Sequence, residues 1–330
     1  MNSKTGDALG LDHAAVRDSF SRAASGYDAA AILQAQVREE LLDRLGLVKL
    51  EPAVVLDLGA GTGHASLELK RRYRRSRVIA TDLAAGMLRE ARHRQTLLRR
   101  FDRVGADAAA LPFRDGSVDL IFSSLMLQWC TDPDAVLREC RRVLKPGGLL
   151  TFTTLGPDTL VELRRAWGAA DAGHPHVNTF LDMHDLGDAL IRAGLAEPVM
   201  DVERCTLTYD EVRGLMRDLK AIGAHNASAG RPKGLTGKRT LARMIESYEA
   251  FRRPDGKLPA TYEVVFGQAW GPVGSARSKA PSEREIRVPV GNIGKRKKTD
   301  GDQRIAAAAE ALSRSSAGVL GTHYLLTSDT

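Results

Sequence analysis

The feature that most constrains the fold is a glycine-rich segment, VVLDLGAGTG, at residues 54–63. Its first six residues predict a buried strand, and residues 64–73 predict a helix. Glycine at positions 59, 61 and 63 permits a tight turn and lets the backbone approach a ligand closely. A strand, a glycine loop and a helix in this order are typical of α/β folds that bind nucleotides at the carboxyl ends of parallel strands.

Strands and helices alternate after this loop. Further strands are predicted at 77–83, 103–107, 118–124, 148–155, 198–209 and 260–270. The helices that separate them are predicted at 86–94, 134–144, 158–170 and 184–193. The strands before residue 156 are apolar almost throughout, as expected when helices cover both faces of a parallel sheet. The sequence therefore predicts an α/β fold: a Rossmann-like, doubly wound and mostly parallel sheet of seven strands.

The segments around this core predict the domain organisation. Residues 1–48 are expected to form an N-terminal helical lid, with one helix from Val16 to Leu45. Residues 49–209 form the core, 210–259 a helical insertion, and 260–270 the final core strand. Residues 271–330 read as a linker followed by a basic tail that we expect to be disordered.

The amino-acid composition indicates which kinds of partner the chain can bind. The net charge of +7 and pI of about 9.4 suit nucleic acid, a membrane face or an acidic protein, but the richness in Ala, Arg and Gly explains the charge equally well. Aromatic residues are only 5% and no RNP or zinc-finger motif is present, which disfavours a nucleic-acid binder. No apolar run suits a membrane span or secretory signal, and the three cysteines lack metal-site spacing. We expect a cytoplasmic monomer with no metal.

The spacing of the loop identifies its ligand. A dinucleotide fingerprint would need glycine at position 64, where this chain has His64. The G-x-G-x-G form found here is the one used for S-adenosylmethionine. Asp82 ends the second strand, where its carboxylate can accept hydrogen bonds from both ribose hydroxyls, and Asp107 ends the third, near the adenine amino group. The predicted cofactor contacts are Asp57, Gly59, Ala60, Gly61, Gly63, Asp82, Leu83, Met87, Asp107, Ala108 and Ser124.

With LKPGG at 144–148, this arrangement resembles the class I S-adenosylmethionine-dependent methyltransferases. Other segments are similar to the malonyl-[acyl-carrier protein] O-methyltransferases of biotin biosynthesis. They are FSRAASGYD (20–28), LPFRDGSVDLIFSSLMLQWC (111–130), TLGPDTLVELRRAW (154–167), HVNTFLDMHDLGDALIRAGL (176–195), LTYDEVRGLMRDLKAIGAHN (207–226) and DGKLPATYEVVFGQAW (255–270). The resemblance implies transfer of a methyl group from S-adenosylmethionine to the free carboxylate of malonyl-acyl carrier protein, or of malonyl-coenzyme A. The resulting methyl ester would prime pimeloyl synthesis for biotin.

Such a reaction needs positioning and not a general base, because the acceptor carboxylate is already ionised at neutral pH. Candidates for positioning the substrate are Tyr27 on the lid, and Gln128 and Trp129 after the fourth strand. Tyr27 either contacts the acceptor or only packs the lid helix. Trp129 follows the carboxyl end of a strand, where ligands of open α/β sheets bind.

The insertion carries a basic ridge, in which Arg213, Arg217 and Lys220 share one helix face beside an apolar stripe. Acyl carrier proteins are strongly acidic, so the predicted docking residues are Arg213, Arg217, Lys220, Lys233, Lys238 and Arg239. The alternative is an ordinary solvated helix face.

Three other functions stay open on the sequence. The tail motif DG-x-x-PATY also resembles a complex I assembly factor associated with protein arginine hydroxylation. A small-carboxylate or quinone methyltransferase has the same loop, and so has a non-catalytic regulator that binds the cofactor. FSRAASGYD, LQWC and the segment from DLKAIGAHN to GLTG favour the malonyl enzyme.

Overall fold

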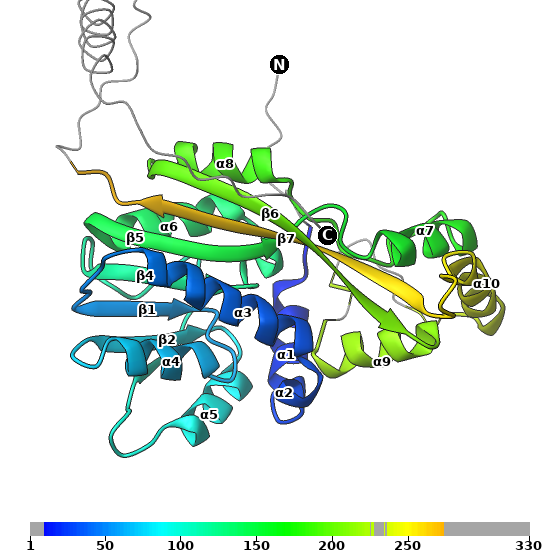
Figure 1. Cartoon of the computed structure of the whole chain (residues 1–330), viewed down its shortest axis with the longest axis horizontal. Helices are drawn as coiled ribbons and strands as arrows, with labels where there is room; N and C mark the ends of the chain where they lie inside the picture. The colour runs from blue at the N-terminus through cyan, green and yellow to red at the C-terminus, as the bar shows by residue number, and fades with distance from the viewer. Residues whose placement is uncertain (1–9, 225, 228–233, 235, 274–330) are drawn as a thin grey trace, which may run out of the picture. The chain divides into compact units, whose positions relative to one another are not determined.

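The strands form one sheet in the order β3-β2-β1-β4-β5-β7-β6 (Figure 1). The computed structural model describes residues 10–224, 226–227, 234 and 236–273. The strands in this part of the chain are β1 (Val54–Leu58), β2 (Arg77–Asp82), β3 (Asp102–Gly105), β4 (Val118–Ser124), β5 (Leu144–Leu155), β6 (Ala196–Tyr209) and β7 (Leu258–Trp270). β1 to β5 pair in parallel, and β7 runs antiparallel between β5 and β6. The predicted Rossmann-like, mostly parallel sheet of seven strands is confirmed.

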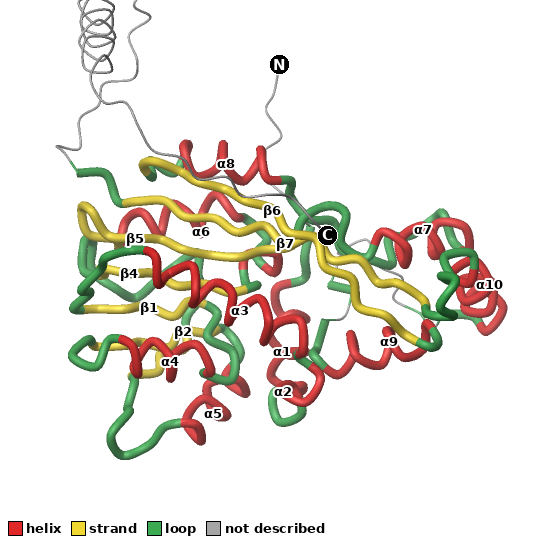
Figure 2. The backbone as a smooth tube through the Cα atoms, in the orientation of Figure 1, coloured by secondary structure: helices red, strands yellow, loops and turns green. Residues whose placement is uncertain are grey.

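Helices cover both faces of this sheet, as Figure 2 shows. The helical elements are α1 (His13–Ala23), α2 (Tyr27–Ala30), α3 (Ile32–Arg44), η1 (Leu45–Leu47), α4 (His64–Arg72), α5 (Ala85–Arg94), η2 (Leu127–Trp129), α6 (Pro133–Val143), α7 (Val161–Ala170), α8 (Met183–Arg192), α9 (Val212–Ala221) and α10 (Lys238–Glu249). At the start of α6, the Asp132 carboxylate accepts a hydrogen bond from Ala135 N (2.9 Å), and Pro133 occupies the first turn.

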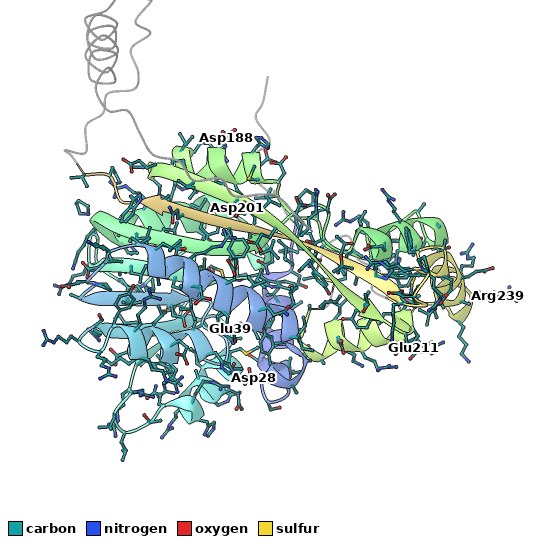
Figure 3. The ribbon with its side chains drawn as sticks, in the orientation of Figure 1. Asp28, Glu39, Asp188, Asp201, Glu211 and Arg239 are labelled. Carbon is teal, nitrogen blue, oxygen red and sulfur yellow. The ribbon has the colours of Figure 1, made fainter. Side chains whose placement is uncertain are left out.

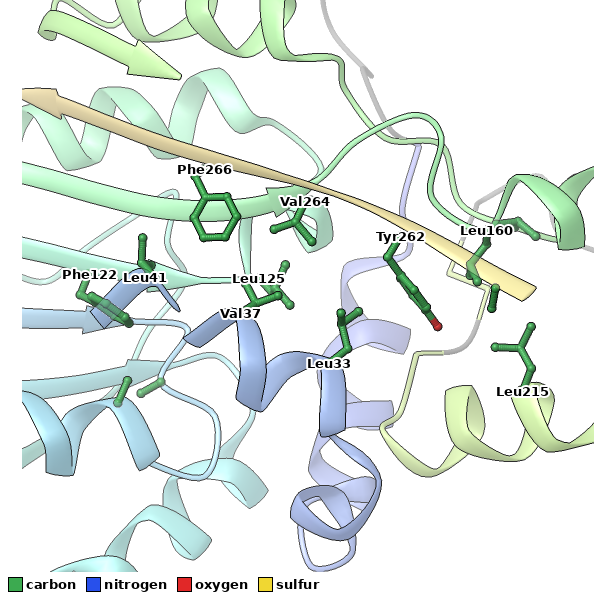
Figure 4. Close-up of a cluster of buried hydrophobic side chains, with 14 of the residues drawn as sticks. Leu33, Val37, Leu41, Phe122, Leu125, Leu160, Leu215, Tyr262, Val264 and Phe266 are labelled. Carbon is green, nitrogen blue, oxygen red and sulfur yellow. The ribbon is translucent and has the colours of Figure 1, made fainter. Parts of the chain in front are cut away.

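Successive strand residues point to opposite faces and build two cores. Val55 and Leu120 pack with α3 and α4 on one face, while Leu56 and Ile121 pack with α6 and α8 on the other. Figure 4 shows the first core, in which Leu33, Val37 and Leu41 of α3 lie against residues of β4 and β7. The segment that enters from the lid is thereby fixed to the sheet.

The lid is not the single helix that the sequence predicts from Val16 to Leu45. Over residues 10–47 the chain forms α1, α2 and α3, with breaks near Gly26 and at Ala31, whose ψ of 48° is not helical. Serine and glycine at 25–26 have low helix propensity. The buried side chains of Ala24 and Ala31 hold both breaks in place, so tertiary packing overrides the apolar periodicity on which the prediction rested.

β6 and β7 pair along their whole length, from Ala196↔Trp270 to Tyr209↔Leu258. β5 pairs with β7 only as far as Leu155↔Val264, so the β6–β7 pair continues beyond the rest of the sheet. α9 and α10 lie at this extended end, and α10 packs on α7 (Figure 1). The predicted linker and tail lie outside the described residues, apart from residues 271–273. Among the described residues, no helix is long and apolar enough to cross a membrane.

Candidate active site

A cavity opens at the carboxyl ends of β1, β2 and β4, where the strand order reverses. It encloses about 760 Å³ of open space, part of it continuous with solvent. The predicted residues that line it are Gly59, Gly61, Asp82, Leu83, Met87, Asp107, Ala108, Ser124, Tyr27 and Trp129. Asp57, Ala60, Gly63 and Gln128 are not among its lining residues.

The glycine loop forms the floor of this cavity. Gly59 and Gly61 have positive φ angles of 76° and 54°, in the left-handed region that favours glycine. A Cβ on Gly59 would lie 2.3 Å from Met126 Cγ, whereas one on Gly61 would meet no protein atom within 4 Å. Since Gly61 lines the cavity, a side chain there would occupy the space that a ligand needs.

Gly63 serves packing instead. Its φ is 82°, and a Cβ there would lie 2.8 Å from Ala91 Cβ of α5. The residue type at position 63 therefore allows α5 to approach the start of α4.

Asp82 closes the loop from the end of β2. Its Oδ2 accepts a hydrogen bond from Gly61 N and its Oδ1 one from Ala84 N, both at 2.8 Å. Burial raises the pKa of this carboxyl above its ordinary value. Each oxygen retains acceptor capacity, and the residue lines the cavity. The carboxylate is therefore suited to a ligand with two hydroxyl groups, such as a ribose.

Asp57 lies beneath the loop and not in the cavity. Its side chain is buried, and its Oδ2 accepts a hydrogen bond from Ser66 Oγ of α4. Burial raises the pKa of Asp57 to about 7, and the nearby charge of Asp82 acts in the same direction. This carboxyl joins β1 to α4 and so shapes the loop from below.

Asp107 stands at the other end of the cavity, beyond β3. Its Oδ1 accepts a hydrogen bond from Ala109 N at 2.9 Å, and its Oδ2 lies 3.7 Å from His13 Nε2 of α1. The lid therefore reaches across the cavity to Asp107.

Asp28 of α2 connects the lid to the glycine loop. Its Oδ1 accepts a hydrogen bond from Thr62 Oγ1 (2.6 Å), its Oδ2 accepts one from Arg94 Nη2, and His64 Nε2 lies 3.3 Å from Oδ2. Arg94 also donates from Nε to the carbonyl oxygen of Thr62 at 2.9 Å. Burial opposes ionisation of Asp28, but the Thr62 hydrogen bond and the Arg94 charge outweigh it and lower the pKa of Asp28. We call Asp28, Thr62, His64 and Arg94 the lid clasp.

A second cavity adjoins the first and encloses about 750 Å³ of open space, part of it continuous with solvent. The two share Phe20, Tyr27, Leu125 and Trp129, so these residues form the boundary between them. Phe20 packs edge-on against Trp129 with ring centroids 5.1 Å apart. The polar residues of the second cavity come from distant parts of the chain: Tyr27, Gln34, Gln128, His176, Asn178, Asn226 and Tyr262.

The predicted positioning residues Tyr27 and Gln128 differ in whether their polar groups are available to bind a ligand. Tyr27 contacts both cavities, and burial together with the charges of Asp82 and Asp28 raises its pKa, so its hydroxyl stays a donor. Gln128 lines only the second cavity, and its amide is engaged by the protein. Its Nε2 donates to the Leu125 carbonyl oxygen at 2.7 Å, and its Oε1 accepts from Thr154 Oγ1 at 3.2 Å.

The basic residues of the insertion fall into two groups. Arg213, Arg217 and Lys220 are exposed on α9, and Leu219 of this helix and Ile222 directly after it line the second cavity. Arg217 and Lys220 also line a groove with Arg22 of α1, and Arg217 pairs with Glu211 at 3.1 Å. Lys238 and Arg239 begin α10, and Figure 3 shows Arg239 on this second helix, at the same end of the molecule as Glu211. Lys233 lies outside the described residues.

Sequence reasoning missed several residues that the fold brings to the site. Asp28 directly follows Tyr27 in FSRAASGYD, and a carboxylate next to a candidate tyrosine was a usable indication. His176 and Asn178 stand in HVNTF, a segment that the sequence singled out without assigning a role to its residues. Tyr262 lies on the final strand, to which the sequence assigned no site residue.

A family model described as "Methyltransferase domain" matches residues 56–152. A malonyl-[acyl-carrier protein] O-methyltransferase of Methylovorus sp. (strain MP688) is 57% identical over 274 residues, covering 81% of this chain and 92% of that protein. The protein of the same name from Laribacter hongkongensis is 53% identical over 288 residues, covering 85% of this chain and 96% of that protein.

Among solved structures, a protein of Bacillus halodurans C-125 superposes with a TM-score of 0.51. It is 19% identical, and the match covers 71% of this chain and 98% of that one. At this identity the likeness concerns the fold alone. Together with the matched methyltransferase domain it confirms the class I methyltransferase fold that the sequence predicts.

Proposed function

We infer the function from the premise that this chain belongs to the malonyl-[acyl-carrier protein] O-methyltransferase family. It is an S-adenosylmethionine-dependent methyltransferase whose acceptor is the free carboxylate of a malonyl group on acyl carrier protein. The relatives do not favour the alternatives of an arginine hydroxylase or a small-carboxylate methyltransferase. The resemblance to enzymes of biotin biosynthesis implies that the methyl ester primes pimeloyl synthesis.

The main support for placing the methyl donor and the acceptor is that two cavities adjoin at Tyr27 and Trp129. The first has the glycine cradle and the Asp82 carboxylate that suit the nucleoside of S-adenosylmethionine. We assign the second cavity to the malonyl group. A donor and an acceptor in adjoining cavities, separated only by side chains, would bring the reacting atoms into line.

When bound, S-adenosylmethionine supplies an activated methyl group on a sulfonium. The residues of this chain have the remaining tasks. Asp82 and Asp107 orient the two ends of the nucleoside, and Phe20 packed on Trp129 keeps water from the boundary. The Tyr27 hydroxyl donates a hydrogen bond to the acceptor carboxylate. Methyl transfer to the acceptor would need no residue of this chain to act as a base, because the carboxylate is already ionised at neutral pH.

The carrier protein is proposed to dock on α9. Arg213, Arg217 and Lys220 project from the side of the helix away from Leu219 and Ile222, which line the second cavity. A basic surface next to the acceptor cavity is complementary to an acidic carrier. Lys238 and Arg239 are proposed to extend this surface at α10, and Lys233 completes the predicted set. We further propose that the chain works as a cytoplasmic monomer without nucleic-acid or membrane partners, because its substrates need neither.

The test compares acceptors at a fixed S-adenosylmethionine concentration. Malonyl-carrier protein, malonyl-coenzyme A, acetyl-carrier protein and free malonate are supplied separately, and S-adenosylhomocysteine formation is measured. We expect turnover with the two malonyl thioesters and none with acetyl-carrier protein, which lacks a free carboxylate. Equal turnover with acetyl-carrier protein, or turnover confined to free malonate, would contradict the proposal.

A further inference from the structure

The malonyl carboxylate that we assign to the second cavity is negatively charged, whereas much of the cavity wall is apolar. Apolar residues such as Leu33, Leu160 and Leu163 form much of its wall. A carboxylate that leaves water for such a wall needs a charged or hydrogen-bonding partner. Among the described residues that line this cavity, His176 is the single side chain that can carry a positive charge.

His176 is held rigidly on two sides. Its Nε2 lies 2.9 Å from Asp171 Oδ2, and its ring stacks on the indole of Trp167 with centroids 3.9 Å apart and planes 8° from parallel. Trp167 belongs to α7, and Asp171 directly follows that helix. Only 9% of the histidine side chain is exposed. A side chain fixed in this way pays little entropy when it binds a ligand.

The pairing with Asp171 also decides which nitrogen is available. The hydrogen bond from His176 lowers the pKa of Asp171, so this carboxylate is ionised and favours a proton on Nε2. The other ring nitrogen, Nδ1, has no hydrogen-bond partner among the described residues, although the histidine lines the cavity. A protonated ring can therefore donate from Nδ1 while Nε2 keeps its bond to Asp171.

Asn178 provides a second donor beside it. Its side chain is buried, and its Oδ1 accepts a hydrogen bond from Ala227 N at 3.2 Å. This bond orients the amide, and the Asn178 NH₂ group remains as a donor in the same cavity.

We propose that His176, fixed by Asp171 and Trp167, binds the carboxylate of the acceptor through Nδ1 and selects carboxylate-terminated acyl thioesters over uncharged ones. Asn178 assists as a neutral donor. His176 would hold the oxygen that does not attack, and the Tyr27 side of the cavity is left to the attacking oxygen. This inference rests on the proposed function, because it assumes that the second cavity receives the malonyl group.

The experiment compares three variants with the wild-type chain on malonyl-carrier protein. His176→Phe keeps the stacking on Trp167 and removes both nitrogens, and His176→Gln restores a neutral donor. His174→Gln is the matched control, because His174 lies 3.3 Å from the same Asp171 carboxylate but is exposed and outside the cavity lining. KM and kcat for the carrier substrate, the Kd for S-adenosylmethionine and the Tm are measured for each.

We expect His176→Phe to raise KM for malonyl-carrier protein roughly ten- to a hundredfold, the loss of one charge-assisted hydrogen bond. His176→Gln should recover part of that loss, and His174→Gln should resemble the wild type. The Kd for S-adenosylmethionine should change less than about twofold in all three, because the cofactor cavity is separate. A purely structural role of His176 would instead lower Tm and weaken both substrates together.

An unchanged KM in His176→Phe, with the wild-type chain active on malonyl-carrier protein, would overturn the inference alone. If His176→Phe does not fold, Asp171→Asn replaces it: it leaves the ring in place, and an unchanged KM would overturn the inference in the same way. A wild-type chain without activity on any malonyl thioester would overturn the proposed function and this inference with it.

Discussion

At the scale of single residues, burial beneath the glycine loop changes the ionisation of Asp57. The carboxyl has a pKa of about 7 in the folded chain, against 3.8 for an unperturbed aspartate. The folded state therefore binds this proton more tightly than the unfolded state does. The free energy of unfolding contributed by this group is greatest below pH 3.8, falls as pH rises to about 7, and is lost above it.

Replacing Asp57 with Asn tests this pH dependence in the cofactor-free protein. The amide cannot ionise, and its oxygen can still accept the hydrogen bond from Ser66 Oγ. We expect similar Tm values for the variant and the wild type near pH 4, and a variant more stable by about 1–3 kcal/mol at pH 8. Scanning calorimetry across this range measures the difference. Asp188→Asn, at an exposed position on α8 (Figure 3), controls for the loss of an acidic charge. If the Tm of Asp57→Asn and the Tm of the wild type change with pH in the same way, Asp57 does not cause this pH dependence.

At the scale of elements, the lid and the sheet are joined by the lid clasp. α1 and α2 cover the cofactor cavity, and Asp28 of α2 connects them to Thr62 in the loop and to Arg94 at the end of α5. Asp28 directly follows Tyr27 in the sequence. Loss of the clasp contacts of Asp28 should therefore change the orientation of the Tyr27 side chain, which lines both cavities.

Asp28→Ala should weaken S-adenosylmethionine binding roughly three- to tenfold, since it removes several partly exposed charged contacts at once. The Tm should fall only slightly, because α3 remains packed in the first core (Figure 4). Isothermal titration with S-adenosylhomocysteine measures the affinity. Asp18→Ala is the matched control: it removes an exposed aspartate of α1 whose one ion pair among the described residues is with its neighbour Arg17. Equal affinities in the two variants would exclude a role for the clasp in cofactor binding.

The basic ridge of α9 has a separate test. Changing Arg213, Arg217 and Lys220 together to Glu should raise KM at least about tenfold for malonyl-carrier protein, through loss of charge complementarity. KM for malonyl-coenzyme A should change much less, because it presents no acidic protein surface. Glutamate at Arg74, Arg75 and Arg100, which are exposed and outside α9, gives the same change of charge elsewhere. Equal losses for both substrates would contradict docking on α9.

At the scale of the whole molecule, the sequence was sufficient to predict the elements of the core, but not the residues that line the acceptor cavity. Apolar strands such as 54–58 and 118–124 and their intervening helices are local patterns, so their bounds were predicted closely. The position of β7 between β5 and β6 depends on pairing between distant segments, and periodicity does not encode it. Tyr27, Gln128, His176 and Tyr262 meet only because that topology brings four distant segments together.

The same contrast applies to the cofactor residues. Gly61 and Asp82 were identified because a glycine spacing and a strand end are visible in the sequence, and they are joined by a hydrogen bond in the structure. Asp57 belongs to the same segment but lies beneath the loop, since alternate residues of β1 face opposite sides of the sheet. The break of the lid into three helices went unpredicted because it depends on contacts with the core.

As a whole, this molecule joins a methyl group to the malonyl carboxylate of a carrier-bound substrate. The most direct test is the intact mass of malonyl-carrier protein after incubation with the full-length chain and S-adenosylmethionine. We expect a gain of one methylene that leaves the carrier together with the acyl group when the thioester is cleaved, as a methyl ester of the malonyl group requires. An unchanged carrier mass, or a gain that remains on the protein part of the carrier, would contradict this expectation.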